Sequence, residues 1–322
     1  GLMLGMGGAT RYSILRSQGR LAEGCAAFTH VLALAGGLAV LFLSLGLFFS
    51  RPLALLLGAE GAVLEMTRTY IRVLLLFSPA FLLNDLLLCF VRNDGAPQRS
   101  MAAMVTGSLS NILLDYLFMV PLNMGIFGAV FATGLAPLIS MAVLSPFFLK
   151  GRNAFRPVPC RPSRALLGLC AAAGLPSLVA EMSSGVVMMV FNGVLLTLTG
   201  STGVAAYGVV ANLSLVVLAI YTGVAQGVQP LLSRYCGTGD RLHIRTTLGY
   251  AAATVLLLSA ALCLATALGA QGVTTLFNRE GDPTLQAMAV QGMRLYFIGC
   301  PWAGLNILMA IYFTSTNIPR PA

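Results

Sequence analysis

The sequence contains 322 residues, of which 57% are hydrophobic and only 9% are charged, with a formal net charge of +9. A soluble domain carries about 25% charged residues, so this composition excludes a soluble globular protein and predicts an integral membrane protein. Apolar runs of more than about 20 residues recur along the chain, whereas membrane β-barrels give segments of about ten alternating residues. We therefore expect an all-α polytopic membrane protein.

The first predicted element is the end of a helix, which covers residues 1 to about 18, and eight longer apolar segments follow it. These crossings are expected at about 24–50, 66–92, 99–121, 126–149, 165–198, 204–233, 246–270 and 285–316. Prolines lie inside four of them, at Pro79, Pro137, Pro176 and Pro301. Each proline frees a backbone carbonyl that neighbouring groups or water must satisfy, so tilted or kinked spans are expected.

The basic residues lie at the ends of the predicted crossings, which argues against nucleic-acid binding. If the first connection lies inside the cell, only five of the 19 basic residues fall on the outer side. These are Arg51, Arg68, Arg72, Arg279 and Arg294. Because Lys and Arg favour the cytoplasmic side, this distribution predicts a multi-pass protein of the plasma membrane (the inner membrane of the cell) with its basic loops in the cytoplasm.

A polar stretch at residues 150–164, with three prolines and five basic residues, is interpreted as a cytoplasmic linker. It separates an N-terminal lobe, 1–149, from a C-terminal lobe, 165–322. The two lobes repeat each other at offsets of 222 and 220 residues. The matches are Arg72, Pro79, Asn84 and Pro97 with Arg294, Pro301, Asn306 and Pro319, and Gly7, Ser13 and Gly19 with Gly227, Ser233 and Gly239.

Matching elements of the two lobes cross the membrane in the same direction, so we expect parallel repeats related by an axis along the membrane normal. The length of the repeat implies six spans per lobe. On this interpretation the sequence is a fragment that lacks the first span, part of the second and the last two.

Three acids, Asp85, Asp115 and Glu181, lie inside predicted crossings. An ionised carboxylate at the bilayer centre costs at least ~2.5 kcal/mol on insertion scales. Each acid therefore needs a partner, a proton or a water-filled cavity. Asp85 lies near the inner end of its crossing, where a structural role is expected.

Asp115 lies one helical turn after Asn111, so the two share a helix face. In an antiparallel hairpin with the next crossing, Thr133 lies at the same depth, and Pro137 frees the Thr133 carbonyl. A carboxylate, an amide, a hydroxyl and a free carbonyl together suit a hard cation or a proton. Asn111, Asp115 and Thr133 are thus the predicted cation site, at which Na⁺ is one candidate; the alternative is a polar cluster that only holds two helices together.

In the C-terminal lobe, Glu181 lies at mid-membrane on a helix that also carries Asn192. Gln226 and Gln229 flank Gly227 farther along the chain. We expect these four polar residues to line a cavity for the transported compound. The alternative for Glu181 is a protonated side chain that is hydrogen-bonded to a neighbouring helix. The alternative for Gln226 and Gln229 is a role in helix packing. The two histidines, His30 and His243, have no partner within helical reach and are expected to be solvated or packed.

Several stretches resemble the multidrug and toxic compound extrusion (MATE) transporters along essentially the whole chain. They are Arg92–Pro97 (RNDGAP), Asn111–Asp115, Gly128–Thr133 and Gln226–Pro230. The resemblance implies a two-lobed, twelve-helix protein that exports amphipathic, often cationic compounds in exchange for Na⁺ or H⁺. It also implies a first-lobe cation site at Asn111, Asp115 and Thr133, completed by an aspartate of a first helix that is absent here, and a cavity acid at Glu181.

The function predicted from the sequence is a cation-coupled antiporter that works by alternating access. It has no enzymatic activity and needs no cofactor besides the coupling ion. We expect a monomer whose partners are small amphipathic or cationic molecules and membrane lipids. The alternative is a lipid-linked saccharide flippase of the same broad superfamily, but a pyrophosphate cargo calls for deep basic residues, and the deep charges here are acidic. An intramembrane enzyme is disfavoured because no HExxH motif occurs, and because Asp85 and Asp115 are expected near opposite membrane faces.

Overall fold

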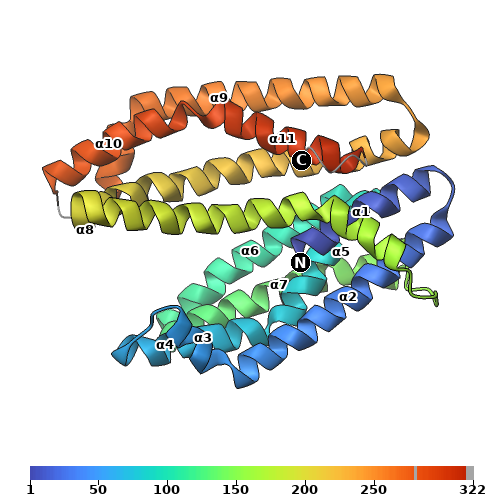
Figure 1. The fold of residues 1–322 in the computed structure, drawn as a ribbon, viewed down its shortest axis with the longest axis horizontal. Coiled ribbons are helices and arrows are strands. Elements are labelled where there is room, and N and C mark those ends of the chain that lie inside the picture. The colour runs from blue at the N-terminus through green and yellow to red at the C-terminus, as the bar shows by residue number, and fades with distance from the viewer. Residues whose placement is uncertain (279–280, 317–322) are drawn as a thin grey trace. The chain divides into compact units, whose positions relative to one another are not determined.

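A computed structural model describes residues 1–278 and 281–316, and within these ranges all regular secondary structure is helical (Figure 1). The helices are α1 (Leu2–Ser17), α2 (Leu21–Phe48), α3 (Ser50–Leu56), α4 (Gly61–Leu76), α5 (Ser78–Asn93), α6 (Pro97–Met119), α7 (Gly125–Leu149), α8 (Arg164–Thr238), α9 (Arg241–Phe277), α10 (Pro283–Phe297) and α11 (Cys300–Ser315). Arg279 and Pro319, named above, lie outside the described residues.

Six helical segments of the described chain are long and apolar enough to cross a membrane. They are α2, α6, α7, the two parts of α8 (Arg164–Gly200 and Thr202–Thr238) and α9. Two bent pairs, α4 with α5 and α10 with α11, each provide one more span if the pair is counted as a broken helix. With both pairs counted in this way, the segments correspond in number and position to the eight predicted crossings, and α1 corresponds to the predicted helix end.

The two bends occur at equivalent places in the sequence repeat. Each pair is bent by 47°, and α5 and α11 carry Pro79 and Pro301 in their first turns. Proline cannot donate to the preceding turn and its ring clashes with that turn, so a continuous helix breaks there. Pro137, in contrast, remains inside α7. The long α8 changes direction at Gly200, where a φ of 68° requires a residue without a Cβ atom.

The chain forms two compact units, Gly1–Leu175 and Pro176–Ala322. The boundary falls inside α8 because the first turns of this helix pack against α1. A Cβ atom on Gly7 would overlap the Cys170 carbonyl, and one on Gly174 would overlap the Met3 carbonyl. Small residues at both positions let the two helix backbones approach closely.

At one end of the first unit, buried aromatic side chains form a cluster. It contains Tyr12, Phe28, Phe90 and Phe155, with ring centroids 4.8 to 5.9 Å apart. Three of these residues come from α1, α2 and α5, whereas Phe155 comes from the segment between α7 and α8 and is 0% exposed. The segment that precedes α8 therefore contributes to the core of the first unit.

The second unit has its own core between the second part of α8 and the helices α9, α10 and α11. Tyr221, Val255, Met293, Phe297 and Leu308 are its largest fully buried members. The Tyr221 hydroxyl lies 2.7 Å from Ser259 Oγ of α9, which satisfies both polar groups.

A candidate cation site in the first unit

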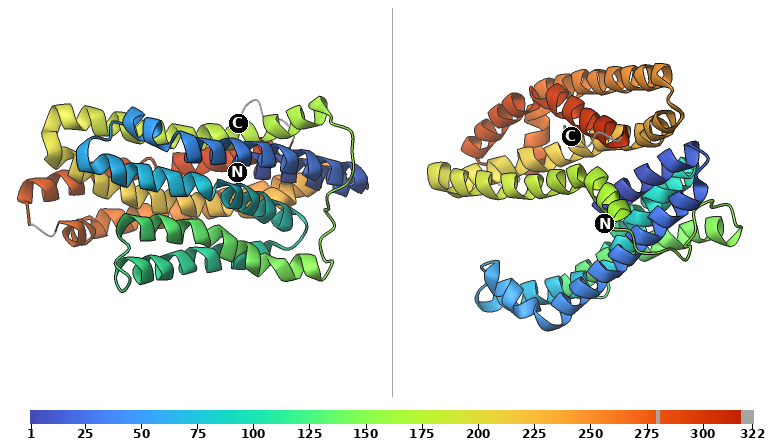
Figure 2. Two further views of the ribbon diagram at one scale, coloured as in Figure 1. Left: turned by 90° about the horizontal axis from the view of Figure 1, so that it is seen from below. Right: turned by 45° about the vertical axis from the view of Figure 1, so that its right-hand side comes forward.

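The helices α6 and α7 lie side by side and antiparallel (Figure 2), and two contacts fix their register. The ring of Phe118 lies 5.6 Å from that of Phe131, centroid to centroid. A Cβ atom on Gly107 would lie 3.1 Å from both the Ala136 carbonyl oxygen and Ser140 Cβ. The part of α6 between Gly107 and Phe118 is consequently level with the part of α7 between Phe131 and Ser140.

Asn111, Asp115 and Thr133 all fall inside this stretch. Asn111 follows Gly107 by one helical turn and Thr133 precedes Ser140 by two, so these two side chains lie on the facing sides of α6 and α7. Asp115 lies one turn beyond Asn111. All three residues are half-buried.

Two polar atoms in this group are buried and have no hydrogen-bond partner among the described residues: Asn111 Nδ2 and Asp115 Oδ1. The Thr133 hydroxyl donates to the Ala129 carbonyl at 3.0 Å, which leaves its oxygen lone pairs available. A buried polar atom without a partner costs roughly 1–3 kcal/mol. Rotating the Asn111 amide by 180° exchanges its nitrogen and oxygen, so this group can present an oxygen instead.

Ser140, which was not among the residues predicted from the sequence, extends the polar row along the seam between α6 and α7. Its side chain is 2% exposed, and its Oγ atom has no partner in the part of the chain that the structure describes. Its spacing of seven residues from Thr133, two helical turns on one face, was the available signal.

The four predicted cavity residues of the second unit all lie on α8, in different environments. Glu181 is exposed, and Asn192 and Gln226 are half-buried. Gln229 is 0% exposed; its Nε2 donates to Ser233 Oγ at 3.3 Å. Gln229 is therefore packed inside the second unit, whereas the other three residues are at least partly exposed.

Asp94, at the C-terminal end of α5, has a fully buried side chain. It accepts hydrogen bonds from the Tyr12 hydroxyl at 2.6 Å and from the Ala154 N–H at 2.7 Å, and it forms an ion pair with Arg16. One carboxylate thus joins α1, the end of α5 and the segment before α8. Asp94 belongs to the RNDGAP motif, but the motif alone did not predict this role.

Further hydrogen bonds hold the predicted linker against α2. The Val158 N–H donates to Thr29 Oγ1 at 2.9 Å, and the Ser163 N–H donates to His30 Nε2 at 2.8 Å. His30 Nδ1 lies 2.7 Å from the Ala26 carbonyl, so this nitrogen carries the ring proton. The expectation that His30 has no partner within helical reach is wrong, because Ala26 lies one turn earlier on the same face.

The same expectation for His243 is also wrong. His243 Nδ1 lies 2.6 Å from the carboxylate of Asp240, which caps the N-terminus of α9. The backbone N–H of His243 also donates to that carboxylate, at 3.1 Å. Hydrogen bonding to the charged form lowers the pKa of Asp240 below its ordinary value.

The chain is similar to a known protein family and to named relatives. The family model described as MatE matches residues 1–117 and 176–322. The multidrug export protein MepA of Staphylococcus saprophyticus is 26% identical over 264 residues, which are 81% of this chain and 58% of that protein. MepA of Staphylococcus aureus strain bovine RF122 / ET3-1 is 27% identical over 210 residues, 64% of this chain and 46% of that protein. The chain thus spans about half the length of these relatives.

Solved structures show the same fold. A crystal structure of MATE in complex with MaL6 superposes with a TM-score of 0.92 at 23% identity, covering 99% of this chain and 72% of that one. The outward-facing conformation of a multidrug resistance MATE family transporter of the MOP superfamily gives 0.90 at 23% identity, with coverage of 99% and 72%. Since the family model matches most of the sequence and the helices follow the same architecture, the chain belongs to the MatE family of multi-pass membrane transporters.

Proposed function

We propose that the complete protein exports amphipathic or cationic compounds in exchange for Na⁺ or H⁺, by alternating access across the plasma membrane. The observation that carries this proposal is the pair of buried, unpartnered polar atoms, Asn111 Nδ2 and Asp115 Oδ1, level with Thr133. Relatives with the name multidrug export protein support an export role.

The chemistry of the site suits a hard cation or a proton. The Asp115 carboxylate, the Asn111 amide oxygen and the Thr133 hydroxyl are oxygen donors of the kind that Na⁺ prefers. Pro137 lies four residues after Thr133 and frees a fourth oxygen, the Thr133 carbonyl. Neutralising Asp115 removes the cost of a charge in hydrocarbon, so binding changes the relative stability of the helix arrangements around this seam.

Coupling follows from thermodynamic linkage. If the coupling cation and the exported compound favour different states of one two-state transporter, each lowers the affinity for the other by the same factor. Glu181, Asn192 and Gln226 are our candidates for contacts to the exported compound in the second unit. A monomer can carry out this cycle. The excess of basic residues near the 150–164 linker supports a cytoplasmic location for that segment.

The test is gradient-driven transport by the complete natural protein in vesicles. Uptake of an organic cation is measured under an imposed Na⁺ gradient and, separately, an imposed pH gradient. We expect one gradient to drive uptake by the wild type, and Asp115→Asn to abolish the gradient dependence. Asp240→Asn, the same change at an exposed helix cap, serves as the control and should transport normally.

A purely structural role for the polar group predicts a different pattern. If the group only joined two helices, Asp115→Asn would lower thermal stability while gradient-driven uptake per folded molecule stayed at the wild-type level. That result would remove Asp115 from the coupling mechanism.

A further inference from the structure

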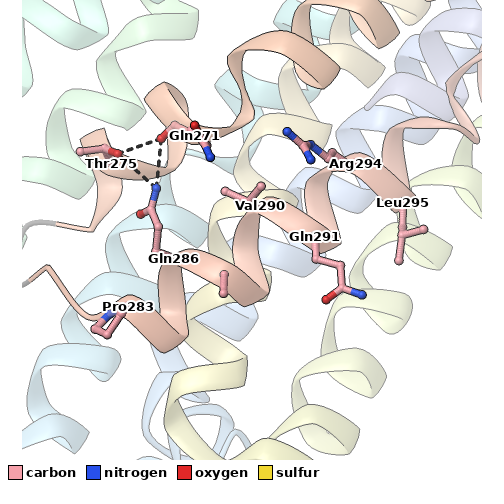
Figure 3. Close-up of a pocket in the computed structure, with 9 residues that line it drawn as sticks. Gln271, Thr275, Pro283, Gln286, Val290, Gln291, Arg294 and Leu295 are labelled. Atoms are coloured by element: carbon pink, nitrogen blue, oxygen red, sulfur yellow. Dashed lines mark hydrogen bonds between the residues drawn. The ribbon is translucent and has the colours of Figure 1, made fainter.

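The second unit contains a cavity of about 680 Å³ between the end of α9 and the helix α10 (Figure 3). This volume lies in the range of small-molecule sites, about 300–1,000 Å³. The residues around it combine amide side chains, apolar side chains and one arginine. They are Gln271, Thr275, Pro283, Gln286, Ala287, Val290, Gln291, Arg294 and Leu295.

One wall of the cavity is held in place by hydrogen bonds. Gln286 Nε2 donates to the Gln271 carbonyl and to Thr275 Oγ1, at 3.1 Å each (Figure 3). Asn278 Nδ2 donates to Gln286 Oε1 at 3.3 Å. These bonds join α9 to α10, so the cavity is a preformed feature of this helix pair.

Arg294 supplies the cavity's only charge among the lining residues. Gln286, Val290 and Arg294 follow one another at intervals of four, so they lie along one face of α10 with the apolar Val290 between the two polar groups. Arg294 is exposed and has no ion-pair partner within residues 1–278 and 281–316. A cationic group next to an apolar surface is thus available to a ligand.

The sequence repeat shows that the residues before Arg294 differ from those at the equivalent place in the first unit. At the offset of 222 residues, Arg294 corresponds to Arg72 of α4. On α4 the two turns before Arg72 carry Glu65 and Arg68, which form an ion pair at 3.2 Å. At the equivalent places α10 carries Ala287 and Val290. It therefore has neither the acid nor the large ion-paired side chains that α4 has there.

The position of the cavity along α9 places it at a membrane surface. The 37 residues of α9 span about 55 Å at ~1.5 Å per residue, against about 30 Å of hydrocarbon. Gln271 lies near the end opposite Arg241, roughly 45 Å along the helix. With Arg241 at one surface, the cavity is level with the headgroups of the other.

We propose that this cavity binds the head of an anionic amphiphile. Its phosphate or carboxylate pairs with Arg294, neighbouring glutamine amides donate to it, and its apolar part lies against Val290 and Leu295. The same phosphate chemistry is offered by a membrane phospholipid and by free phosphate.

The experiment measures lipid retained by the complete natural protein, purified in neutral detergent, by native mass spectrometry. The probes are phosphatidylglycerol, phosphatidylcholine and inorganic phosphate. We expect wild type to retain phosphatidylglycerol in preference to phosphatidylcholine, and Arg294→Gln to weaken this about tenfold or more, as expected for one charge-assisted hydrogen bond. Arg72→Gln changes the equivalent arginine of α4, where Glu65 and Arg68 form an ion pair; it is the matched control and should bind as wild type.

A second variant keeps the arginine and reverses the local charge. Ala287→Glu restores the acid that α4 has at this place, on an exposed position that accepts a longer side chain. It should weaken phosphatidylglycerol retention while the melting temperature stays near that of wild type. Competition by inorganic phosphate at low millimolar concentration identifies the free anion as sufficient, and its failure to compete identifies the lipid as the ligand. Equal retention by wild type and both cavity variants, or equal loss in Arg72→Gln and Arg294→Gln, would overturn the proposal.

Discussion

The buried carboxylate of Asp94 is predicted to be a main support of the first unit, and Asp94→Ala tests this. The substitution leaves the Tyr12 hydroxyl and the Ala154 N–H without their acceptor, and Tyr12 is 0% exposed. Each orphaned donor costs roughly 1–3 kcal/mol. The Arg16 side chain is 41% exposed, so it regains water and adds little. The expected loss is therefore about 2–6 kcal/mol, or on the order of 10 °C in melting temperature.

Two measurements check this expectation. The first is the melting temperature in detergent, with Asp240→Ala as the control because that carboxylate is exposed and its loss should have a smaller effect. The second is trypsin cleavage after Arg152, which should accelerate because Ala154 loses its anchor. A melting temperature within 1–2 °C of wild type, with unchanged cleavage, would show that Asp94 does not hold these segments together.

Two further predictions concern packing and pH. Gly7→Val should destabilise or unfold the first unit, because the valine side chain would overlap the Cys170 carbonyl. Gly36→Val is the control: a Cβ atom at Gly36 has nothing within 4 Å, so this variant should express and melt normally. Similar melting temperatures of the two variants would contradict the close approach of α1 and α8. Asp240 has a lowered pKa in the folded protein, so its stabilisation is present above its ordinary pKa of 3.8 and is lost as pH falls through the folded value. The difference in melting temperature between wild type and Asp240→Ala should therefore be constant above about pH 5 and shrink below pH 4. A difference that does not vary with pH would show that the ionised Asp240 carboxylate does not stabilise the N-terminus of α9.

The helical spans could be predicted because few backbone conformations are stable in hydrocarbon. A chain segment in lipid must satisfy its own N–H and C=O groups, so each long apolar run becomes a helix. Prolines then mark the breaks where the preceding turn cannot be completed, as at Pro79 and Pro301. The shared depth of Asn111, Asp115 and Thr133 could also be predicted, since helical spacing and a short hairpin determine which side chains are level.

The anchoring of the linker could not be predicted by the same means. Asp94 and Ala154 are 60 residues apart, and His30 and Ser163 are 133 apart. Such contacts join an irregular segment to helix ends, and they leave no periodic pattern in the sequence. The Arg294 cavity could not be predicted for a related reason: it forms where α10 packs against the end of α9, and spacing within one helix does not show this contact.

The most direct test of the central proposal, that Asp115 holds a coupling cation, is the affinity of the complete natural protein for an organic cation at a series of Na⁺ concentrations and pH values. We predict that the wild-type dissociation constant rises with either Na⁺ or H⁺ concentration, by the same factor by which the organic cation weakens binding of that ion. We also predict that the dissociation constant of Asp115→Asn is independent of both. A wild-type affinity that ignores both ions, or an Asp115→Asn variant that retains the wild-type dependence, would contradict the proposal.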